Sequence, residues 1–305
     1  MRDLTIVHKR TPLERHKRDE HDTEFIKFLE AHPSLYKSYV DADEKHHRES
    51  ELFFKILDRL GLSYKTLNLD ELANSNQDFY HFNAKNLLTS NLNLVISLGG
   101  DGTLLQTSHY IGGTTALLGV NSAPEFSIGH LCKLNVLQVE KWFEKKEQPK
   151  KINRLKVQNL SKNENYPLVL NDALFCNKHP GATSRYQLSL KNPLQKKLET
   201  HISSGVWIST AVGQTAGISA YKFKKHASTS RKLFVAVREP YQASCKIPLE
   251  MIKFSFDAFA AKLTILSEMR HAVLCLDGHE YGKYLTFGDE IEISSDEESM
   301  LRLHL

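Results

Sequence analysis

The first half of the chain alternates apolar runs of strand length with segments of helical periodicity. The apolar runs are short and end at turn residues, which is typical of buried strands. They cover residues 4–7, 62–69, 94–98 and 116–120. Phe53 and Leu57 fall on one helical face, and Gly61 stands where a C-cap belongs, so a helix is predicted over residues 43–60. Residues 102–110 are expected to form a further helix.

Strands that alternate with helices predict βαβ units and a parallel sheet, whose ligand sites lie at the carboxyl ends of the strands. Residues 11–40 are rich in His, Lys, Arg and Glu and are interpreted as an exposed helical insertion. Residues 74–76 are a polar stretch before the third apolar run.

The pattern changes near residue 150, after a run rich in Lys and Glu that Pro149 closes. Downstream, the apolar segments are short, alternating and bounded by turns, which indicates β structure. They include residues 186–190, 206–209, 233–237, 274–276 and 290–293. We therefore expect an α/β N-terminal domain with a Rossmann-like parallel sheet over residues 1–148, and a mostly β C-terminal domain over 149–305 whose end packs back on the first.

Composition narrows the class of protein. Of the 305 residues, 41% are hydrophobic and 25% are charged, as in ordinary globular proteins of two domains. The formal net charge of +4 suits an anionic ligand such as a nucleotide and is too small to indicate nucleic acid. No apolar run reaches the length of a membrane span and no signal peptide is visible, so no membrane partner is expected. The four scattered cysteines lack a Cys-x-x-Cys pair, which favours a reducing cytoplasm, and we predict no structural metal.

The sharpest motif is Gly99-Gly100-Asp101-Gly102, which follows the apolar run 94–98 and opens a helix. Glycines let the backbone turn tightly and approach a ligand, and a helix N-terminus attracts phosphate. The motif is not a Walker A loop, because no Lys-Ser/Thr follows, and Leu105 occupies the place of the third glycine in a dinucleotide fingerprint.

A carboxylate inside a phosphate-binding turn has two interpretations. Asp101 accepts a proton from a hydroxyl that attacks a phosphoryl group, or it caps the helix. The residues alone leave both open. Asp277, which precedes Gly278, is interpreted as a turn residue.

A strand followed by Gly-Gly-Asp-Gly-Thr resembles both the NAD kinases and the lipid kinases of the diacylglycerol and sphingosine type. Further segments, in one order, favour the NAD kinases, and the series is most similar to the branch that holds plant NADH kinase and the mitochondrial type of NAD kinase. These segments are residues 119–124 (GVNSAP) with 129–132 (GHLC), 170–172 (LND), 203–217, 237–240 (VREP), and 276–278 (LDG) with 288–295.

The resemblance implies an NAD(H) kinase, which transfers a phosphoryl group from ATP to the 2′-hydroxyl of the adenosine ribose of NAD or NADH and gives NADP(H). It implies Mg²⁺ that arrives with ATP, a homodimer or higher homo-oligomer, and Asp101 as the catalytic proton acceptor. The residues that it implies for substrate binding are Gly100, Gly102, Thr103, Asn121, Asn171, Asp172, Ser184, Arg185, Ser204, Thr215, Ala216, Gly217 and Ser219.

The chain departs from the family pattern at the second glycine motif. Gln214 stands in place of a Ser, Gly217 in place of a Tyr, and Ser204 in place of an Asp that touches the other nucleoside half. The alternatives are therefore a catalytically weakened dinucleotide-binding regulator, or a lipid or alcohol kinase of related fold.

Overall fold

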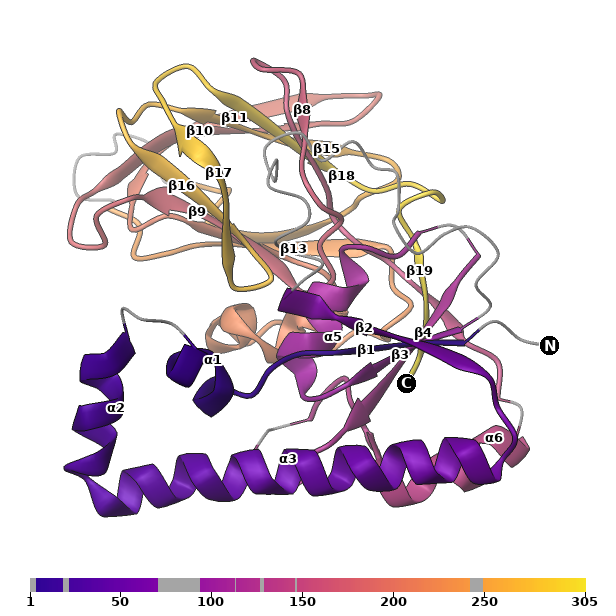
Figure 1. Cartoon of the computed structure of the whole chain (residues 1–305). Helices are drawn as coiled ribbons and strands as arrows, with labels where there is room; N and C mark the ends of the chain where they lie inside the picture. The colour runs from indigo at the N-terminus through magenta and orange to yellow at the C-terminus, as the bar shows by residue number, and fades with distance from the viewer. Residues whose placement is uncertain are drawn as a thin grey trace.

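The computed structural model describes residues 4–18, 22–70, 94–112, 114–126, 129–145, 147–241 and 249–305. The polar stretch at 74–76 lies outside these residues. Within the described part, the N-terminal half is an α/β layer structure and the C-terminal half is almost entirely antiparallel β structure (Figure 1). This is the predicted fold class.

The first sheet has seven strands, and its centre is parallel, as the alternation of strands and helices predicts. In spatial order the strands are β2 (Tyr64–Asn68), β1 (Leu4–His8), β3 (Leu94–Leu98), β4 (Ala116–Asn121), β19 (Leu301–His304) and β6 (Lys150–Ile152), and the short β5 (Leu134–Asn135) pairs with β4. All five residues of β3 are buried, in agreement with its unbroken apolar sequence.

Helices cover both faces of this sheet. Helices α3 (Pro33–Arg59) and α6 (Val139–Lys145) lie on one face, and α5 (Asp101–Ser108) lies on the other, toward the second half of the chain (Figure 1). Because successive side chains of a strand point to opposite faces, Ile6 packs in the cluster that holds Phe53, whereas Val7 packs in the cluster that holds Leu104.

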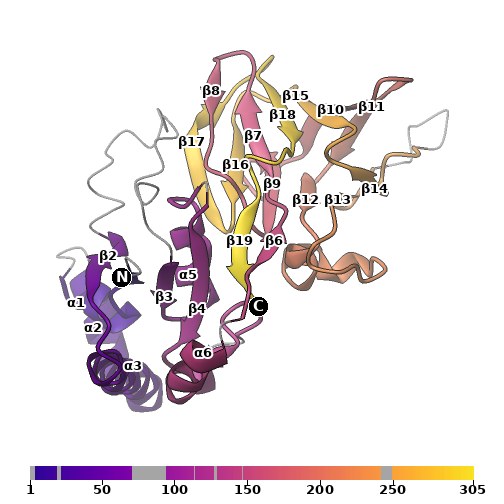
Figure 2. The same cartoon turned by 90° about the vertical axis from the view of Figure 1, so that its right-hand side faces the viewer.

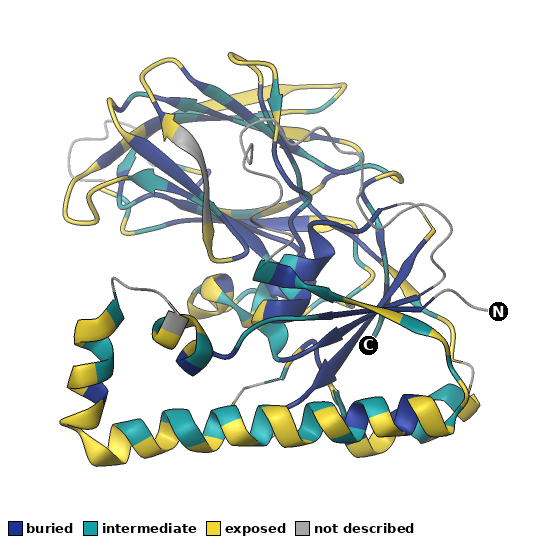
Figure 3. Cartoon of the chain, viewed as in Figure 1, coloured by how far each residue is buried: buried dark blue, intermediate teal, exposed yellow. Residues whose placement is uncertain are grey.

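The predicted helix at 43–60 is longer than its apolar pattern indicates. It begins at Pro33, and Gly61 follows its end in the left-handed conformation, with a φ of +64°. Its buried residues, Phe53, Ile56 and Leu57, all lie in its last third, so the outer two thirds carry no periodic apolar signal (Figure 3). The rest of the insertion forms α1 (Pro12–Arg18) and α2 (Thr23–Glu30), which confirms its helical interpretation.

The second half contains two six-stranded antiparallel sheets, and the strands predicted there are confirmed. One sheet has the order β11 (Lys196–Ser203), β10 (Ser184–Lys191), β15 (Lys262–Ser267), β18 (Glu290–Ser294), β7 (Lys156–Asn159) and β8 (Glu164–Asn165). The other has the order β14 (Lys253–Asp257), β13 (Lys232–Val237), β12 (Val206–Ser209), β9 (Asp172–Asn177), β16 (Ala272–Leu276) and β17 (His279–Leu285).

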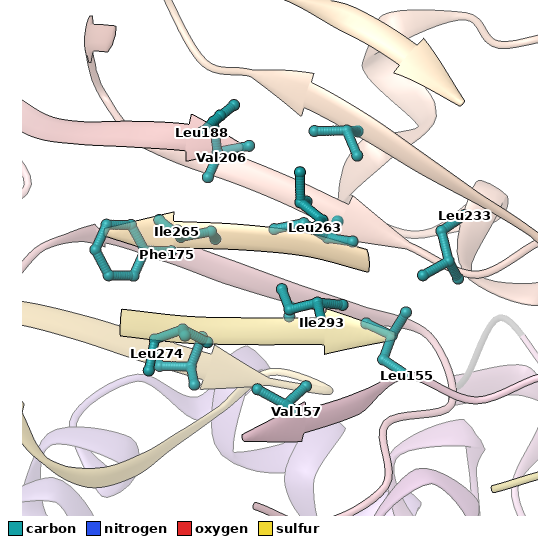
Figure 4. Packing of buried hydrophobic residues seen from close by; sticks show 14 of the residues in the cluster. Leu155, Val157, Phe175, Leu188, Val206, Leu233, Leu263, Ile265, Leu274 and Ile293 are labelled. Atoms are coloured by element: carbon teal, nitrogen blue, oxygen red, sulfur yellow. The ribbon is translucent and has the colours of Figure 1, made fainter. Parts of the chain in front are cut away.

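The two sheets pack face to face around one apolar cluster. Figure 4 shows Phe175 and Leu274 from one sheet beside Ile265 and Ile293 from the other. Each of these side chains is 1% exposed or less, so the cluster is closed to water. Its burial supplies the main stabilisation of this half.

The two halves are joined by strand pairing and by a shared core. After β18 the chain returns to the first sheet, where β19 pairs in parallel with β4 and antiparallel with β6 (Figure 2). Leu170 and Val212 of the second half pack in one cluster with Leu104 and Leu131 of the first. The division of the chain at residues 148 and 149 stays a prediction. Among the helices of the described residues, none is both long enough and apolar enough to cross a membrane.

Replacement of Phe175 by Ala is expected to lower the free energy of unfolding by about 3–5 kcal/mol, because the fully buried ring leaves a cavity between the sheets. Leu194→Ala is the control, since this side chain is 95% exposed, and its effect should stay within about 0.5 kcal/mol. Urea unfolding of both variants measures the difference. Equal effects would show that the sheets do not pack as described.

Candidate active site

The glycine turn lies at the carboxyl end of β3, where a parallel sheet places its ligands. Gly99 has a φ of +154°, and a Cβ atom at this position would lie 2.5 Å from Oγ1 of Thr103. Any side chain there would push the turn away from the first turn of α5. Gly100 precedes the helix, whose amino end has the free N–H groups and positive dipole that suit a phosphate.

The carboxylate of Asp101 is held by the backbone of a separate loop. Its Oδ1 accepts hydrogen bonds from the N–H groups of Leu131 (3.0 Å) and Cys132 (2.9 Å), and its Oδ2 accepts one from His130 (2.8 Å). The helix-cap interpretation is wrong, because Gly100 is the N-cap residue and the Asp101 carboxylate instead fixes the GHLC loop against the turn. This anchoring gives a structural reason for an acid at Asp101, and it applies whether or not the residue is catalytic.

Two further groups face the turn. The ammonium Nζ of Lys9 lies 3.5 Å from the point where a Cβ on Gly102 would stand, so it flanks the first turn of α5. Burial lowers the pKa of Lys9, and the charge of Arg15 lowers it further, whereas Asp70 and Cys132 oppose the shift. The hydroxyl of Thr103 is buried, and no described residue hydrogen-bonds to it.

Asn121 lies at the end of β4, next to the turn. Its Oδ1 accepts a hydrogen bond from the N–H of Ala123 (3.0 Å), so the side chain shapes the GVNSAP segment. The neighbouring Ser122 hydroxyl lies 2.6 Å from Nδ1 of His46, which comes from α3. The segments GGDG, GVNSAP and GHLC thus meet in space, as their resemblance to one family implies.

Asp172 begins β9 in the second half of the chain, and Asn171 directly precedes it. The backbone carbonyl of Asn171 accepts hydrogen bonds from the N–H of Thr210 (2.9 Å) and the hydroxyl of Ser209 (3.1 Å). The side-chain Oδ1 of Asn171 is buried and has no hydrogen-bond partner among the described residues. A buried acceptor without a donor is costly, and a bound ligand would supply one.

Asp172 is buried and carries a shifted acidity. The pKa of Asp172 is raised to about 7, first by burial and second by the negative charge of Asp277, whereas a hydrogen bond from the N–H of Gly217 opposes the shift. The carboxyl group therefore changes its protonation state near neutral pH, and with it the kind of hydrogen bond that it makes with a ligand.

The second glycine motif packs directly on this pair. A Cβ on Gly213 would lie 2.2 Å from the backbone oxygen of Asn171, so only glycine permits this approach. Residues 215–217 follow in two short 3₁₀ helices, η5 (Val212–Thr215) and η6 (Gly217–Tyr221). Thr215 is exposed, as is Ser219, and Ala216 is half-buried, so this segment borders the pair at the protein surface.

The structure connects the two groups of residues through Asp277. Its carboxylate accepts hydrogen bonds from the backbone N–H groups of residues 170–172 and lies 2.8 Å from Nε2 of His109, which directly follows α5. The turn interpretation of Asp277 is thus only part of its role. The glycines and the NAD kinase-like motifs predicted both the Asp101 turn and the segment 170–172 as parts of the site. No feature of the sequence predicted a role for His109.

Three predicted residues lie elsewhere. Ser184 donates no bond to Asn171 or Asp172; its hydroxyl accepts the N–H of Asn177 (2.9 Å) at the far end of β9, about 17 Å from Asp172 at the usual rise per residue. Arg185 is exposed beside it, and Ser204 binds the backbone oxygen of Arg238 near the same strand ends. The structure therefore separates these three from Asn171 and Asp172.

A cavity of about 340 Å³ opens at the carboxyl ends of β1, β2 and β3. Its lining includes Lys9, Arg10 and Leu98, the residue directly before the glycine turn. Lys9 was missed at the sequence level, although it follows the first apolar run and parallel strands bring their carboxyl ends to one edge. The cationic lining suits a phosphate-bearing ligand.

The described residues do not form a cage for Mg²⁺ beside Asp101. Their one group of three converging potential ligands is Glu14, Asp43 and His47. Glu14 already accepts the N–H of Thr11 (2.8 Å) and Asp43 accepts its hydroxyl, so both carboxylates hold the start of α1.

Comparison with known proteins supports the motif resemblance. The chain is 29% identical to NADH kinase from Arabidopsis thaliana over 307 residues, which cover 85% of this chain and 83% of the relative. It is 26% identical to a "Probable NADH kinase" from Oryza sativa subsp. japonica over 287 residues, which cover 85% and 82%. No family model matches the chain. The predicted resemblance to plant NADH kinase is confirmed.

Solved structures share the fold. An NAD kinase from Archaeoglobus fulgidus in complex with ATP superposes with a TM-score of 0.59 at 16% identity, covering 98% of this chain and 93% of the other. Yeast NADH kinase complexed with NADH gives a TM-score of 0.63 at 13% identity, covering 99% and 83%. The architecture of an α/β half and a β half is therefore common to these proteins.

The raised pKa of Asp172 predicts a pH-dependent stability. Because the folded state favours the protonated carboxyl up to about pH 7, whereas the unfolded state ionises near pH 3.8, the free energy of unfolding falls as pH rises between these values. Each pKa unit corresponds to about 1.4 kcal/mol. Asp172→Asn, which keeps an acceptor for Gly217, should remove this loss and become more stable than the wild type at pH 8.

Urea unfolding at pH 5 and pH 8 measures the effect as the difference between variant and wild type. Asp41→Asn, on the exposed face of α3, is the control and should follow the wild type at both pH values. A difference for Asp172→Asn that does not change with pH would contradict the assignment.

Proposed function

We propose that the chain is an NAD(H) kinase, which transfers the terminal phosphoryl group of ATP to the 2′-hydroxyl of the adenosine ribose of NAD or NADH and forms NADP(H). The proposal rests on one observation above others. The Asp101 turn is connected through His109 and Asp277 to Asn171 and Asp172, where a buried amide oxygen has no donor among the residues that the structure describes. The names and bound ligands of the similar proteins, ATP and NADH among them, agree with this assignment.

Asn171 and Asp172 have the chemistry to bind the adenosine half. The free Oδ1 of Asn171 accepts a hydrogen bond from a hydroxyl or amino group. Ionised Asp172 accepts a second one, while the Gly217 N–H holds its carboxylate in place. Thr215 and Ala216 border the same ligand, and Ser219 lies farther along the segment.

We assign to Asp101 the role of accepting the proton of the attacking hydroxyl. Its Oδ1 already accepts two N–H groups, but Oδ2 accepts only one, so a lone pair of Oδ2 remains for the ribose hydroxyl. The loop 130–132 fixes the carboxylate before substrate arrives, which removes the cost of orienting it during the reaction. The neighbouring backbone of Gly102 and Thr103 approaches the same ribose.

The phosphates of ATP are assigned to the cavity beside the turn. Lys9 borders both the cavity and Gly102, so its ammonium group lies where negative charge accumulates during phosphoryl transfer. Mg²⁺ bound to the phosphates would supply further charge neutralisation.

Two wider features belong to the same proposal. We expect a homodimer or larger homo-oligomer, which light scattering of the purified protein tests. We expect the cytoplasm as the compartment, which cell fractionation tests.

A second candidate is a dinucleotide-binding regulator without catalysis. The observation that favours it is the use of Asp101 as a structural anchor, because this use gives an acid at Asp101 a reason that does not require turnover. Binding of NADH without formation of NADP(H) would support this candidate.

Asp101→Asn should lower the rate of NADP(H) formation with Mg-ATP by about 100-fold or more, the usual contribution of a general base. An amide cannot take the hydroxyl proton, although its oxygen still accepts part of the backbone hydrogen bonds. NADH binding, followed by its fluorescence, should change only a few-fold.

Asp41→Asn again serves as the control, with full activity expected. Undiminished turnover of Asp101→Asn, with NAD or with NADH, would rule out Asp101 as the proton acceptor. A wild-type protein that binds NADH but forms no product with Mg-ATP would favour the regulator.

Lys9→Met should raise the KM for ATP by about 10-fold or more and leave the KM for NADH within about twofold. Removal of a hydrogen bond to a charged group costs about 1.5–3 kcal/mol, and here the loss weakens the binding of the ATP phosphates. Lys17→Met, at an exposed position of α1, is the matched control. An equal rise of both KM values would mean that Lys9 acts on the fold of the turn and not on the donor.

A further inference from the structure

We infer that Asp277 and His109 form a buried strut that fixes the dinucleotide-binding segment 170–172 relative to helix α5 and the Asp101 turn. Both are positioning residues: they hold other residues of the site without contacting a substrate themselves. The functional part of this inference rests on the proposed kinase activity, and the geometric part stands independently of it.

The carboxylate of Asp277 binds the backbone of segment 170–172. Its Oδ1 accepts the N–H groups of Asn171 (2.7 Å) and Asp172 (3.2 Å), and its Oδ2 accepts that of Leu170 (2.9 Å). The N–H of Asp277 in turn donates to the backbone oxygen of Asp172 (2.9 Å). The carboxylate thus holds the backbone of residues 170–172 in place, because three successive N–H groups donate to one acid.

Asp277 and Gly278 form the two-residue turn between β16 and β17, and both have the positive φ that such a hairpin turn requires. Asp277 has a φ of +49°, in the left-handed region that a non-glycine residue seldom adopts. Its side chain is 0% exposed. The burial of the carboxylate is compensated by the hydrogen bonds that it receives.

His109 connects the Asp277 carboxylate to helix α5, which begins at the proposed base Asp101. Its Nε2 lies 2.8 Å from Oδ2 of Asp277, and its side chain is 2% exposed. Helix α5 begins at Asp101 and ends at Ser108, so eight residues, about 12 Å of helix, join the proposed base to this contact. A rigid element therefore spans the distance between the proposed base and the proposed substrate-binding pair.

Arg154 completes the strut at the end of the helix. Its guanidinium donates to the backbone oxygens of Ser108 (2.7 Å), Ile111 (3.0 Å) and Ser299 (2.8 Å). Burial lowers the pKa of Arg154 to about 10, so it remains cationic at neutral pH and offsets the charge of Asp277. The helix cannot shift without breaking these contacts.

The test compares Asp277→Asn, His109→Leu and His109→Gln with the wild type. His109→Gln is the conservative variant, because its side-chain amide can donate to Asp277 from the place of Nε2. Asp289→Asn is the matched control: Asp289 is another buried turn carboxylate, which accepts a backbone N–H from Thr286 (2.6 Å) and binds Lys162 (2.8 Å), outside the strut.

Three quantities are measured: amide hydrogen exchange of residues 170–172, NADH binding by fluorescence, and the separate KM values for NADH and ATP. Asp277→Asn and His109→Leu should raise exchange at 170–172 at least tenfold and weaken NADH binding about tenfold, with the KM for ATP within about twofold. His109→Gln should recover most of both losses. Asp289→Asn should lower the unfolding midpoint without either change.

Unchanged exchange at 170–172 in Asp277→Asn and His109→Leu would overturn the strut, whatever the activity of the wild type. Raised exchange with unaltered NADH binding would overturn its positioning role. A wild-type protein with neither NADH binding nor turnover would instead overturn the proposed function, and the exchange data would still decide the geometry.

Discussion

The hydrogen bonds that Asp101 accepts from residues 130–132 bring together the parts of the α/β half on which the site depends. A carboxylate beside a helix N-terminus would repel phosphate if its charge were unopposed. Here three N–H dipoles spread that charge, and the same bonds tie a loop to the turn. The loop also packs tightly on β4, since a Cβ on Gly119 would stand 2.7 Å from Sγ of Cys132. Turn, loop and strand therefore behave as one unit.

The unit depends in turn on contacts between the two halves of the chain. Leu170 and Val212 contribute to the same apolar cluster as Leu104 and Leu131, so separation of the halves would expose apolar surface from both. The buried charges at this junction reinforce the arrangement, because a lone ionised group could not remain inside. A site built across such a junction is preorganised by the same forces that stabilise the fold.

The sequence predicted those elements and residues that have a periodic apolar pattern or a glycine motif. The runs at 94–98 and 116–120 became β3 and most of β4, because buried parallel strands read as unbroken apolar runs. The two glycine motifs include Gly99 and Gly213, and at both positions the structure leaves no room for a side chain. The resemblance to the NAD kinases predicted Asn171 and Asp172 as site residues. In the structure, Asp277 and His109 connect these two residues to helix α5, in agreement with that resemblance.

Other features could not be predicted from residue patterns. The first part of α3 has no fully buried residue, and half-buried positions such as Asp43 and His46 are polar, so its start at Pro33 was missed. His109, Arg154 and Asp277 are far apart in the chain, and only the tertiary structure shows that they meet. The same holds for Asp101, since its backbone donors come from a loop about thirty residues away, as their hydrogen bonds record. Roles that depend on burial and long-range contact have no local signature.

The place of β19 has a consequence for how the molecule is made. This strand lies between β4 and β6 in the first sheet, yet it is translated after every strand of the β-rich half. During synthesis on the ribosome, the two sheets of the β-rich half can therefore form while β4 of the first sheet still lacks its partner β19. Unpaired strand edges recruit other chains. The first sheet of the α/β half therefore becomes continuous from β4 to β6 only after residues 301–304 have been made.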